Sequence, residues 1–231
     1  MNFDNMTHAR IYITDSFFFD INDTLIAIWV IGAVLIALAV IARIKIKKFK
    51  DVPDTKFQNI IEAIVESFDN YSTGILTKQY SWLANWFFGL FLFFIVSNVI
   101  GITGVLRPPT ADLALTFAMG FTTVILMQVV GFKYNGINHV KDWMKPFFLF
   151  APLNIIGDLT KSISLSMRLF GNMISGLILM GLIYGMLPWF AGIGLPAGLS
   201  MFFDIFVGLL QAFIFVTVSM FFIMTKTPQT D

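Results

Sequence analysis

Cysteine is absent from this chain of 231 residues, and charged residues make up only 13% of it. Without cysteine the chain has no disulfide, no thiol nucleophile and no thiolate metal site. The low charged fraction and a hydrophobic fraction of 57% exclude an ordinary soluble domain. A formal net charge of +1 gives no reason to expect a nucleic-acid partner. Residues 1–23 hold four aspartates and one arginine, so a cleavable signal peptide is not expected.

Long apolar runs are what the sequence has in abundance. Several reach the roughly 20 residues that a helix needs to cross a hydrocarbon core about 30 Å thick. A barrel-like alternation is missing, and lipid offers no partners to unpaired backbone groups, so the spans must be helical. We therefore predict an all-α polytopic membrane protein, a single membrane domain over residues 1–231. It should contain about five transmembrane helices and an interfacial amphipathic helix.

The predicted elements follow in chain order. They are an external N-terminal segment (1–23), a first span (24–42), a cytoplasmic basic segment with the amphipathic helix (43–81), a second span (82–105), a third span (112–134), a long helix (146–187) and a last long helix (199–225). No proline interrupts the stretch after Pro152, which as a helix of about 36 residues is about 54 Å long. Because this exceeds the membrane thickness, we expect the last two helices to be strongly tilted.

Lysine and arginine are unevenly distributed between the two predicted sides of the membrane. Of the 15 Lys and Arg residues, seven fall in residues 43–81, three in 133–145 and one in 225–231. Cytoplasmic loops carry an excess of these residues. The sequence therefore predicts a multi-pass protein with its N-terminus outside and its C-terminus in the cytoplasm.

A stripe of polar residues follows one face of the long helix. Its members are separated by 3, 3, 4, 4 and 3 residues, and they are Asp158, Lys161, Ser164, Arg168, Asn172 and Ser175. The last helix carries Asp204 and Gln211, which are about 10.5 Å apart along a helix axis. A guanidinium at the centre of the bilayer costs about 2.5 to 3.5 kcal/mol on insertion scales. Arg168 is too central to reach an interface easily, so its presence indicates a function.

Structural roles are the alternatives for each of these residues. Arg168 could form an ion pair with Asp158 or Asp204, and Lys161 could form an intrahelical pair with Asp158. Glycines near the stripe, at 157, 171 and 176, are expected to allow a close helix approach. Asn172 and Gln211 could be interhelical hydrogen-bonding partners, and we expect Asn98 and Gln128 to be packing contacts. His8 and His139 do not indicate a metal site, and no fixed metal or cofactor is predicted.

The stretch "SLSMRLFGNM" resembles the signature of subunit a of the F-type ATP synthases. Further stretches occur in the order of that family: "FQNIIEAIVESF", "NVIGITG", "PPTADLALT", "PLNIIGDLTKSISLSMRLFGNM" and "LLQAFIFVTVSMFF". The resemblance implies a stator subunit that is not catalytic alone and that offers two aqueous half-channels beside a rotating c ring. By the same resemblance, Arg168 separates the half-channels and displaces the ion from the c-subunit carboxylate, with Asn172, Gln211 and Asp204 along the path.

The resemblance also implies partners, a location and a choice of ion. The partners are the c-subunit ring, a b-type peripheral stalk, the remaining ATP synthase subunits and lipid, in a bacterial inner (plasma) membrane. Gly157, Asp158 and Lys161 resemble sodium-translocating members, and Leu177 stands where many relatives carry a titratable group. The coupling ion stays open between H⁺ and a transiently bound Na⁺.

Two other function classes are alternatives to this interpretation. A stand-alone cation-coupled secondary transporter would use Asp158, Asp204 and Arg168 as a relay, but such proteins usually show repeats and broken helices. A membrane enzyme would need a nucleophile, a metal cluster or a phosphate loop, none of which is evident.

Overall fold

The computed structural model describes residues 23–46, 56–77, 80–102, 108–144, 147–186, 198 and 201–227. Within these ranges the chain is helical throughout apart from short turns, and no strand occurs. The α-helices are α1 (Asp23–Ile46), α2 (Lys56–Ile75), α3 (Trp82–Ile102), α4 (Leu113–Asn135), α5 (Asn138–Trp143), α6 (Ala151–Met186) and α8 (Gly208–Met224). Among the described residues, five helices are long and apolar enough to cross a membrane. The predicted class of all-α polytopic membrane protein is confirmed.

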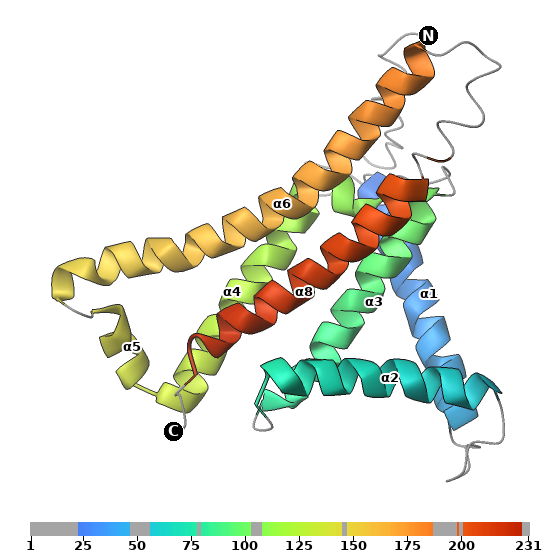
Figure 1. The fold of residues 1–231 in the computed structure, drawn as a ribbon. Helices are drawn as coiled ribbons and strands as arrows, with labels where there is room; N and C mark the ends of the chain where they lie inside the picture. Colours follow the sequence, from blue (N-terminus) through green and yellow to red (C-terminus); the bar gives the residue numbers. More distant parts are fainter. Residues whose placement is uncertain are drawn as a thin grey trace, which may run out of the picture.

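The spanning helices form a bundle around one apolar core. In Figure 1, α3, α4 and α8 lie close together, α1 stands at one edge, and α6 crosses α4 obliquely. Phe87 and Phe94 of α3, Met127 of α4, Leu165 of α6 and Phe215 of α8 are all at most 2% exposed and belong to one buried cluster. One core thus fixes the position of α6 relative to the other spans.

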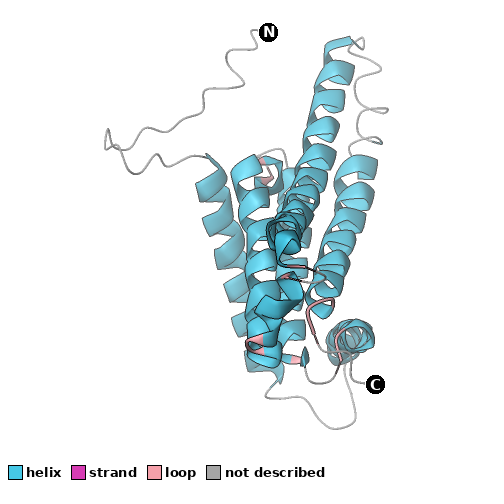
Figure 2. Cartoon of the chain, turned by 90° about the vertical axis from the view of Figure 1, so that its left-hand side faces the viewer, coloured by secondary structure: helices cyan, strands magenta, loops and turns pink. Residues whose placement is uncertain are grey.

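The amphipathic helix α2 lies across one end of the bundle, and Figure 2 shows it along its axis. The Tyr71 hydroxyl lies 2.6 Å from Oγ1 of Thr217 on α8. The Phe68 ring contacts Phe88 and Phe91 of α3. Other apolar residues of α2 stay exposed, such as Ile60, which is 58% exposed. An apolar face left open in this way is typical of a helix that lies in the membrane interface.

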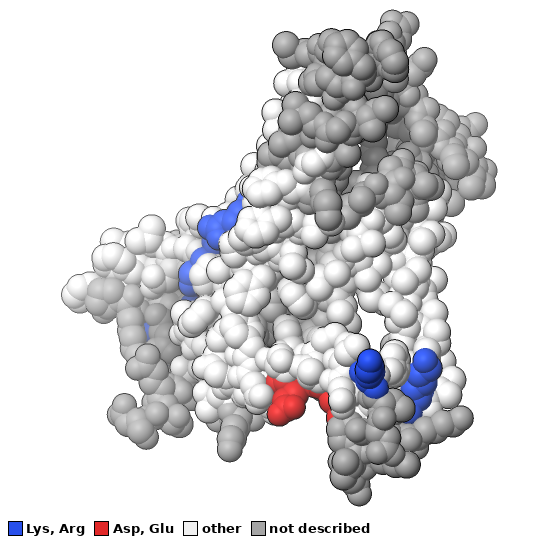
Figure 3. Space-filling view, turned by 45° about the vertical axis from the view of Figure 1, so that its right-hand side comes forward, with Lys and Arg blue, Asp and Glu red and all other residues white. Residues whose placement is uncertain are grey.

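The ends of several elements meet at this same end of the molecule. The C-terminal ends of α1, α4 and α8 all point toward the level of α2 in Figure 1. Figure 3 shows a mostly uncharged surface, with acidic and basic side chains gathered at that end and a further basic group higher up. The described parts of the predicted cytoplasmic segments therefore share one end of the bundle. Which side of the membrane that end faces stays a prediction.

The helix α6 is continuous over 36 residues, from Ala151 to Met186. A 3-10 turn at Phe148–Phe150 precedes it, and the Nδ2 of Asn154 donates a hydrogen bond of 2.7 Å to the Trp143 backbone oxygen of α5. Figure 1 shows α6 running obliquely from the level of α5 past the far end of α4. The expectation of a long, unbroken helix is therefore confirmed, and its one proline stands in the first turn, where a helix tolerates it. Its tilt in the membrane stays a prediction.

Close packing between α4 and α6 comes from a glycine that the sequence did not single out. A Cβ on Gly120 of α4 would collide with the Ser166 hydroxyl and would lie 2.9 Å from the Ser162 backbone oxygen. By contrast, a Cβ on Gly157 or Gly171 would meet nothing within 4 Å. These two glycines therefore make no close approach within the described part of the chain, and their role in the approach of another helix stays a prediction.

The last long helix is less regular than predicted. A π-helical turn at Met201–Val207 precedes α8, and residues 199 and 200 lie outside the described residues. The next residue, Gly208, begins α8, and a Cβ there would lie only 2.6 Å from the Nδ2 of Asn98 on α3. Asn98 is 7% exposed, so it is a packing contact as expected. π-helical turns within α-helices frequently occur at functional sites.

Candidate functional site

Arg168 lies in the middle of α6 with its side chain on the surface. Its neighbours Leu165 and Leu169 are 2% and 3% exposed and anchor the opposite face of the helix in the core. Between described residues, the ion pairs are those of Asp158 with Lys161 and with Lys226, so no described acidic side chain pairs with Arg168. The expected alternative of an Arg168–Asp158 pair is therefore wrong. The Asp204 side chain lies outside the described residues.

The predicted polar stripe is divided in the folded chain. Ser164, Asn172 and Ser175 are exposed on the same side of α6 as Arg168. The Ser175 hydroxyl donates a hydrogen bond of 3.0 Å to the Asn172 backbone oxygen. Asp158 is instead only 4% exposed, because its carboxylate turns toward α4 and the end of α8. The expectation of a single polar face over the whole stripe is corrected at that residue.

One hydrogen bond joins the stripe to the last helix. The Nδ2 of Asn172 on α6 donates to Oε1 of Gln211 on α8 over 2.7 Å. Gln211 is 2% exposed, and its Nε2 has no hydrogen-bond partner in the described part of the chain. Two residues that the sequence selected on separate helices are thus in contact, one turn beyond Arg168 on α6.

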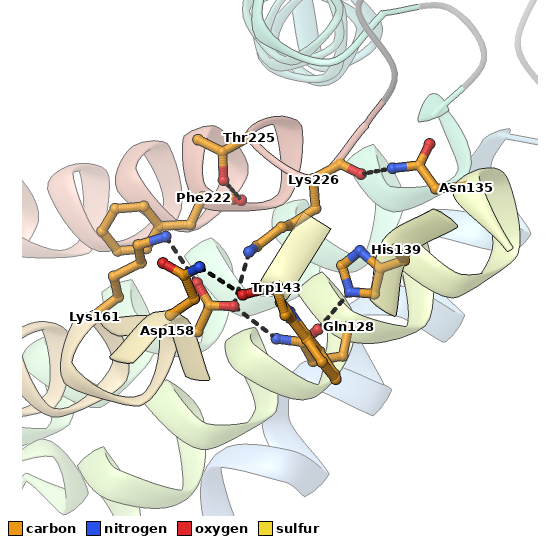
Figure 4. Close-up of polar contacts among 10 residues, drawn as sticks. Gln128, Asn135, His139, Trp143, Asp158, Lys161, Phe222, Thr225 and Lys226 are labelled. Carbon is orange, nitrogen blue, oxygen red and sulfur yellow. Dashed lines mark hydrogen bonds and ion pairs between the residues drawn. The ribbon is translucent and has the colours of Figure 1, made fainter. Parts of the chain in front are cut away.

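A buried polar cluster surrounds Asp158 (Figure 4). The Oδ1 of Asp158 lies 3.0 Å from the Lys161 Nζ. The Oδ2 of Asp158 lies 2.8 Å from the Nζ of Lys226, which follows just beyond α8. The Nε2 of Gln128 on α4 donates to the same Oδ2 over 3.1 Å. The Asn135 side chain donates to the Lys226 backbone oxygen over 2.9 Å. The intrahelical Lys161–Asp158 pair considered from the sequence therefore exists, but within a larger network.

His139 extends this cluster to α5. Its Nε2 lies 2.7 Å from the Gln128 Oε1, and the ring is fully buried between Phe132 and Trp143. A Cβ on Gly131 would lie 2.6 Å from the His139 Nδ1, so only glycine leaves room for the ring. From the sequence, Gln128 is expected to be a packing contact, and His139 receives no role. The available signal was a lone amide within an apolar span and a histidine 11 residues later.

A hollow of about 500 Å³ opens on the surface beside the cluster. Thr160, Lys161 and Ser164 of α6 and Phe222 of α8 line it, and the Lys161 Nζ lies 5.5 Å from the centre of the Phe222 ring. A second hollow, of about 520 Å³, lies between α2 and α3 and contains none of the candidate residues. Within the described ranges, no three His, Asp or Glu side chains gather as metal ligands.

The fold and the site define a polytopic helical membrane protein that exposes a fixed positive charge halfway along an oblique spanning helix. Residues 25–224 match the family described as ATP synthase A chain. The chain belongs to this family, as its resemblance predicted.

Three relatives show how far the similarity extends. The chain is 29% identical over 221 residues to the "ATP synthase subunit a, sodium ion specific" of Propionigenium modestum, covering 89% of this chain and 74% of the relative. It is 32% identical over 197 residues to ATP synthase subunit a of Geobacter sulfurreducens, covering 82% of each. With that of Desulfosudis oleivorans the identity is 29% over 233 residues, covering 96% of this chain and 90% of the relative.

Membership of this family fixes the general function. The protein is a stator subunit of an F-type ATP synthase, a multi-pass, ion-translocating membrane subunit that works in a complex with other ATP synthase subunits. The stand-alone secondary transporter is accordingly set aside.

Proposed function

We propose that Arg168 separates two aqueous half-channels, which carry H⁺ or Na⁺ to and from a rotating c ring, and that it displaces the ion from the c-subunit carboxylate. One observation carries the proposal. The guanidinium is exposed in the middle of a spanning helix and has no ion pair with a described acidic residue. A charged side chain near the centre of the bilayer costs free energy, and such charges are usually paired with another group. The carboxylate of a neighbouring subunit can be that partner.

The physical basis of the step is a competition between cations for one carboxylate. At a separation of 4 Å, opposite unit charges attract by about 4 kcal/mol at an effective dielectric constant of 20. A guanidinium near the carboxylate therefore favours its ionised form and drives off a bound H⁺ or Na⁺. Because arginine keeps its proton where lysine can lose it, the charge also blocks a direct leak between the half-channels.

Polar residues beside Arg168 support an aqueous path on both sides of it. Ser164 and Ser175 are exposed on the same side of α6. Asn172 is exposed as well, and its hydrogen bond to Gln211 ties α6 to α8 at this level. Asp204, whose role rests on the sequence, is proposed as a titratable group of the path from the last helix. Lys161 and Asp158 are proposed to act near one end of it.

The proposal includes the assembly and the membrane. The subunit would contact a c-subunit ring and a b-type peripheral stalk, in a bacterial inner membrane, with its N-terminus outside and its C-terminus in the cytoplasm. A relative whose name carries sodium specificity makes Na⁺ a candidate beside H⁺. ATP hydrolysis by the purified complex, measured against Na⁺ concentration at fixed pH, distinguishes the two ions.

The test of Arg168 is its replacement by alanine in the intact complex. We expect Arg168→Ala to abolish ATP-driven ion pumping in vesicles while the soluble head still hydrolyses ATP. Arg43→Ala is the matched control, because Arg43 is an exposed arginine at the end of α1, and it should pump normally. Substantial coupled pumping by Arg168→Ala would falsify the proposed role.

A further inference from the structure

We infer that Asp158 is a positioning residue for the Lys161 ammonium, which it holds at the wall of the hollow beside α6 and out of the ion path. This inference rests on the proposed function, because it assumes that ions approach Arg168 along this face of α6. The Asp158 side chain is 5% exposed, whereas the Lys161 side chain is 33% exposed and lines the hollow. The ammonium is thus drawn from an open space toward a buried acid.

The position of Lys161 makes its ammonium relevant to ion passage. Lys161 and Arg168 are about 10.5 Å apart along the helix axis. Ser164 lies between them, is exposed and lines the same hollow as Lys161. A cation that approaches Arg168 through the hollow passes Lys161. Because the lysine stem is long and flexible, an ammonium without its carboxylate can swing into the hollow and repel that cation.

Two ammonium groups compete for this one carboxylate. Lys226 lies 2.8 Å from Oδ2 and Lys161 lies 3.0 Å from Oδ1, so the cluster carries one negative and two positive charges. Removing Asp158 releases Lys161, whereas removing Lys226 leaves the carboxylate to Lys161 alone. The two substitutions should therefore change cation access in opposite directions. A purely structural cluster gives no reason for opposite signs.

Gln128 and His139 fix the orientation of the Asp158 carboxylate. A carboxylate only accepts hydrogen bonds, so the Gln128 amide must turn its Nε2 toward Asp158 and its Oε1 toward His139. An amide oxygen also only accepts, so the His139 Nε2 carries a proton and donates. The buried ring of His139 is held by Gly131, Phe132 and Trp143. The helix α5 thereby acts on Asp158 through Gln128.

The test measures ATP-driven pumping by the intact complex in vesicles, titrated with Na⁺ at fixed pH and with H⁺ in Na⁺-free buffer. The variants are compared in the titration with the ion, Na⁺ or H⁺, on which pumping by the unmodified complex depends. We expect Asp158→Asn to raise the concentration for half-maximal pumping by on the order of three- to tenfold, the effect of one unit charge in a partly screened site. Lys226→Gln should lower it. The double variant Asp158→Asn with Lys161→Gln should match Lys161→Gln alone, because no ammonium remains to be released.

The supporting residues give a second, independent arm. Gln128→Leu and His139→Leu should each shift the half-maximal concentration in the same direction as Asp158→Asn but by less. His139→Gln, which keeps a donor near the Nε2 position, should restore it. Thr123→Val is the matched control, because it removes a different buried polar contact of α4, the 3.2 Å contact of Thr123 with Ser219 on α8, without touching Asp158. That variant should titrate like the unmodified complex.

Three results would overturn the inference. They are equal signs for Asp158→Asn and Lys226→Gln, a shift from Asp158→Asn that persists when Lys161 is glutamine, and a fall in assembled complex with an unchanged titration. None of these depends on whether Arg168→Ala still pumps. Failure of the positioning role is therefore distinguishable from failure of the proposed function.

Discussion

Arg168 and Asp158 lie on the same helix, about 15 Å apart along its axis, and their surroundings are opposite. Arg168 is exposed and has no described acidic partner, whereas Asp158 is buried and has two lysines and an amide around its carboxylate. A buried charge is tolerated when it is paired and hydrogen-bonded. The comparison teaches that this chain satisfies one of its charges internally and leaves the other for something outside itself.

The largest effect that could break this comparison is expected from Arg168→Lys. Lysine carries the same positive charge as arginine when it is hydrated. In a poorly hydrated site, however, a lysine ammonium can lose its proton, whereas an arginine guanidinium keeps its proton. We expect coupled pumping to be lost at neutral and higher pH. Any residual pumping should be confined to low pH, where the lysine stays protonated. Pumping by vesicles measured across the pH range checks this, and a pH-independent, fully active variant would contradict it.

Removing the buried Asp158 carboxylate should lower the stability of the complex as well as alter its coupled pumping. Asp158→Ala removes a buried carboxylate and its bonds to Lys161, Lys226 and Gln128, and losing hydrogen bonds to a charged group costs about 1.5 to 3 kcal/mol. The thermal midpoint of the purified complex should fall accordingly. Thr122→Ala is a control from the exposed face of α4, where the hydroxyl bonds only to its own helix, and should stay within about 0.5 kcal/mol. Equal thermal midpoints for Asp158→Ala and Thr122→Ala would contradict the expected contribution of the Asp158 carboxylate to stability.

The smallest effect, a loss of stability, is expected from breaking the hydrogen bond between exposed Asn172 and buried Gln211. Asn172→Ala removes the partner of a Gln211 amide that is 2% exposed, and an unsatisfied buried amide costs about 1 to 3 kcal/mol. Ser175→Ala, which removes only a bond to the backbone of the same helix, should cost less than about 0.5 kcal/mol. The same thermal measurement ranks the two. A larger loss for Ser175→Ala would show that the stripe is not organised around the Asn172–Gln211 contact.

The fold and the stripe could be predicted because they depend on local patterns. Run length identified the spans, and helical spacing placed Ser164, Arg168 and Asn172 on one side of α6. The π-helical turn could not be predicted in this way, because it lies where Asn98 from another helix presses on Gly208. The distance of about 10.5 Å between Asp204 and Gln211 assumed a regular α-helix, whereas Asp204 lies in the π-helical turn and Gln211 in α8.

The Asp158 cluster escaped prediction for a related reason. Its members come from α4, α5, α6 and the chain beyond α8, so no sequence spacing joins them. Only the Asp158–Lys161 pair is local, and it was the part the sequence indicated. Gln128 looked like an isolated amide because its two partners are 11 and 30 residues away in the chain.

The contact of Gly120 with Ser162 and Ser166 has a mechanical consequence. A stator must bear the sideways load of a turning neighbour without yielding. Because Gly120 has no side chain, its backbone lies directly against the Ser166 hydroxyl and the Ser162 backbone oxygen, so α6 has little room to move relative to α4 and a force on its outer face is transmitted to the bundle. A glycine in the third span thus stiffens the longest of the described helices.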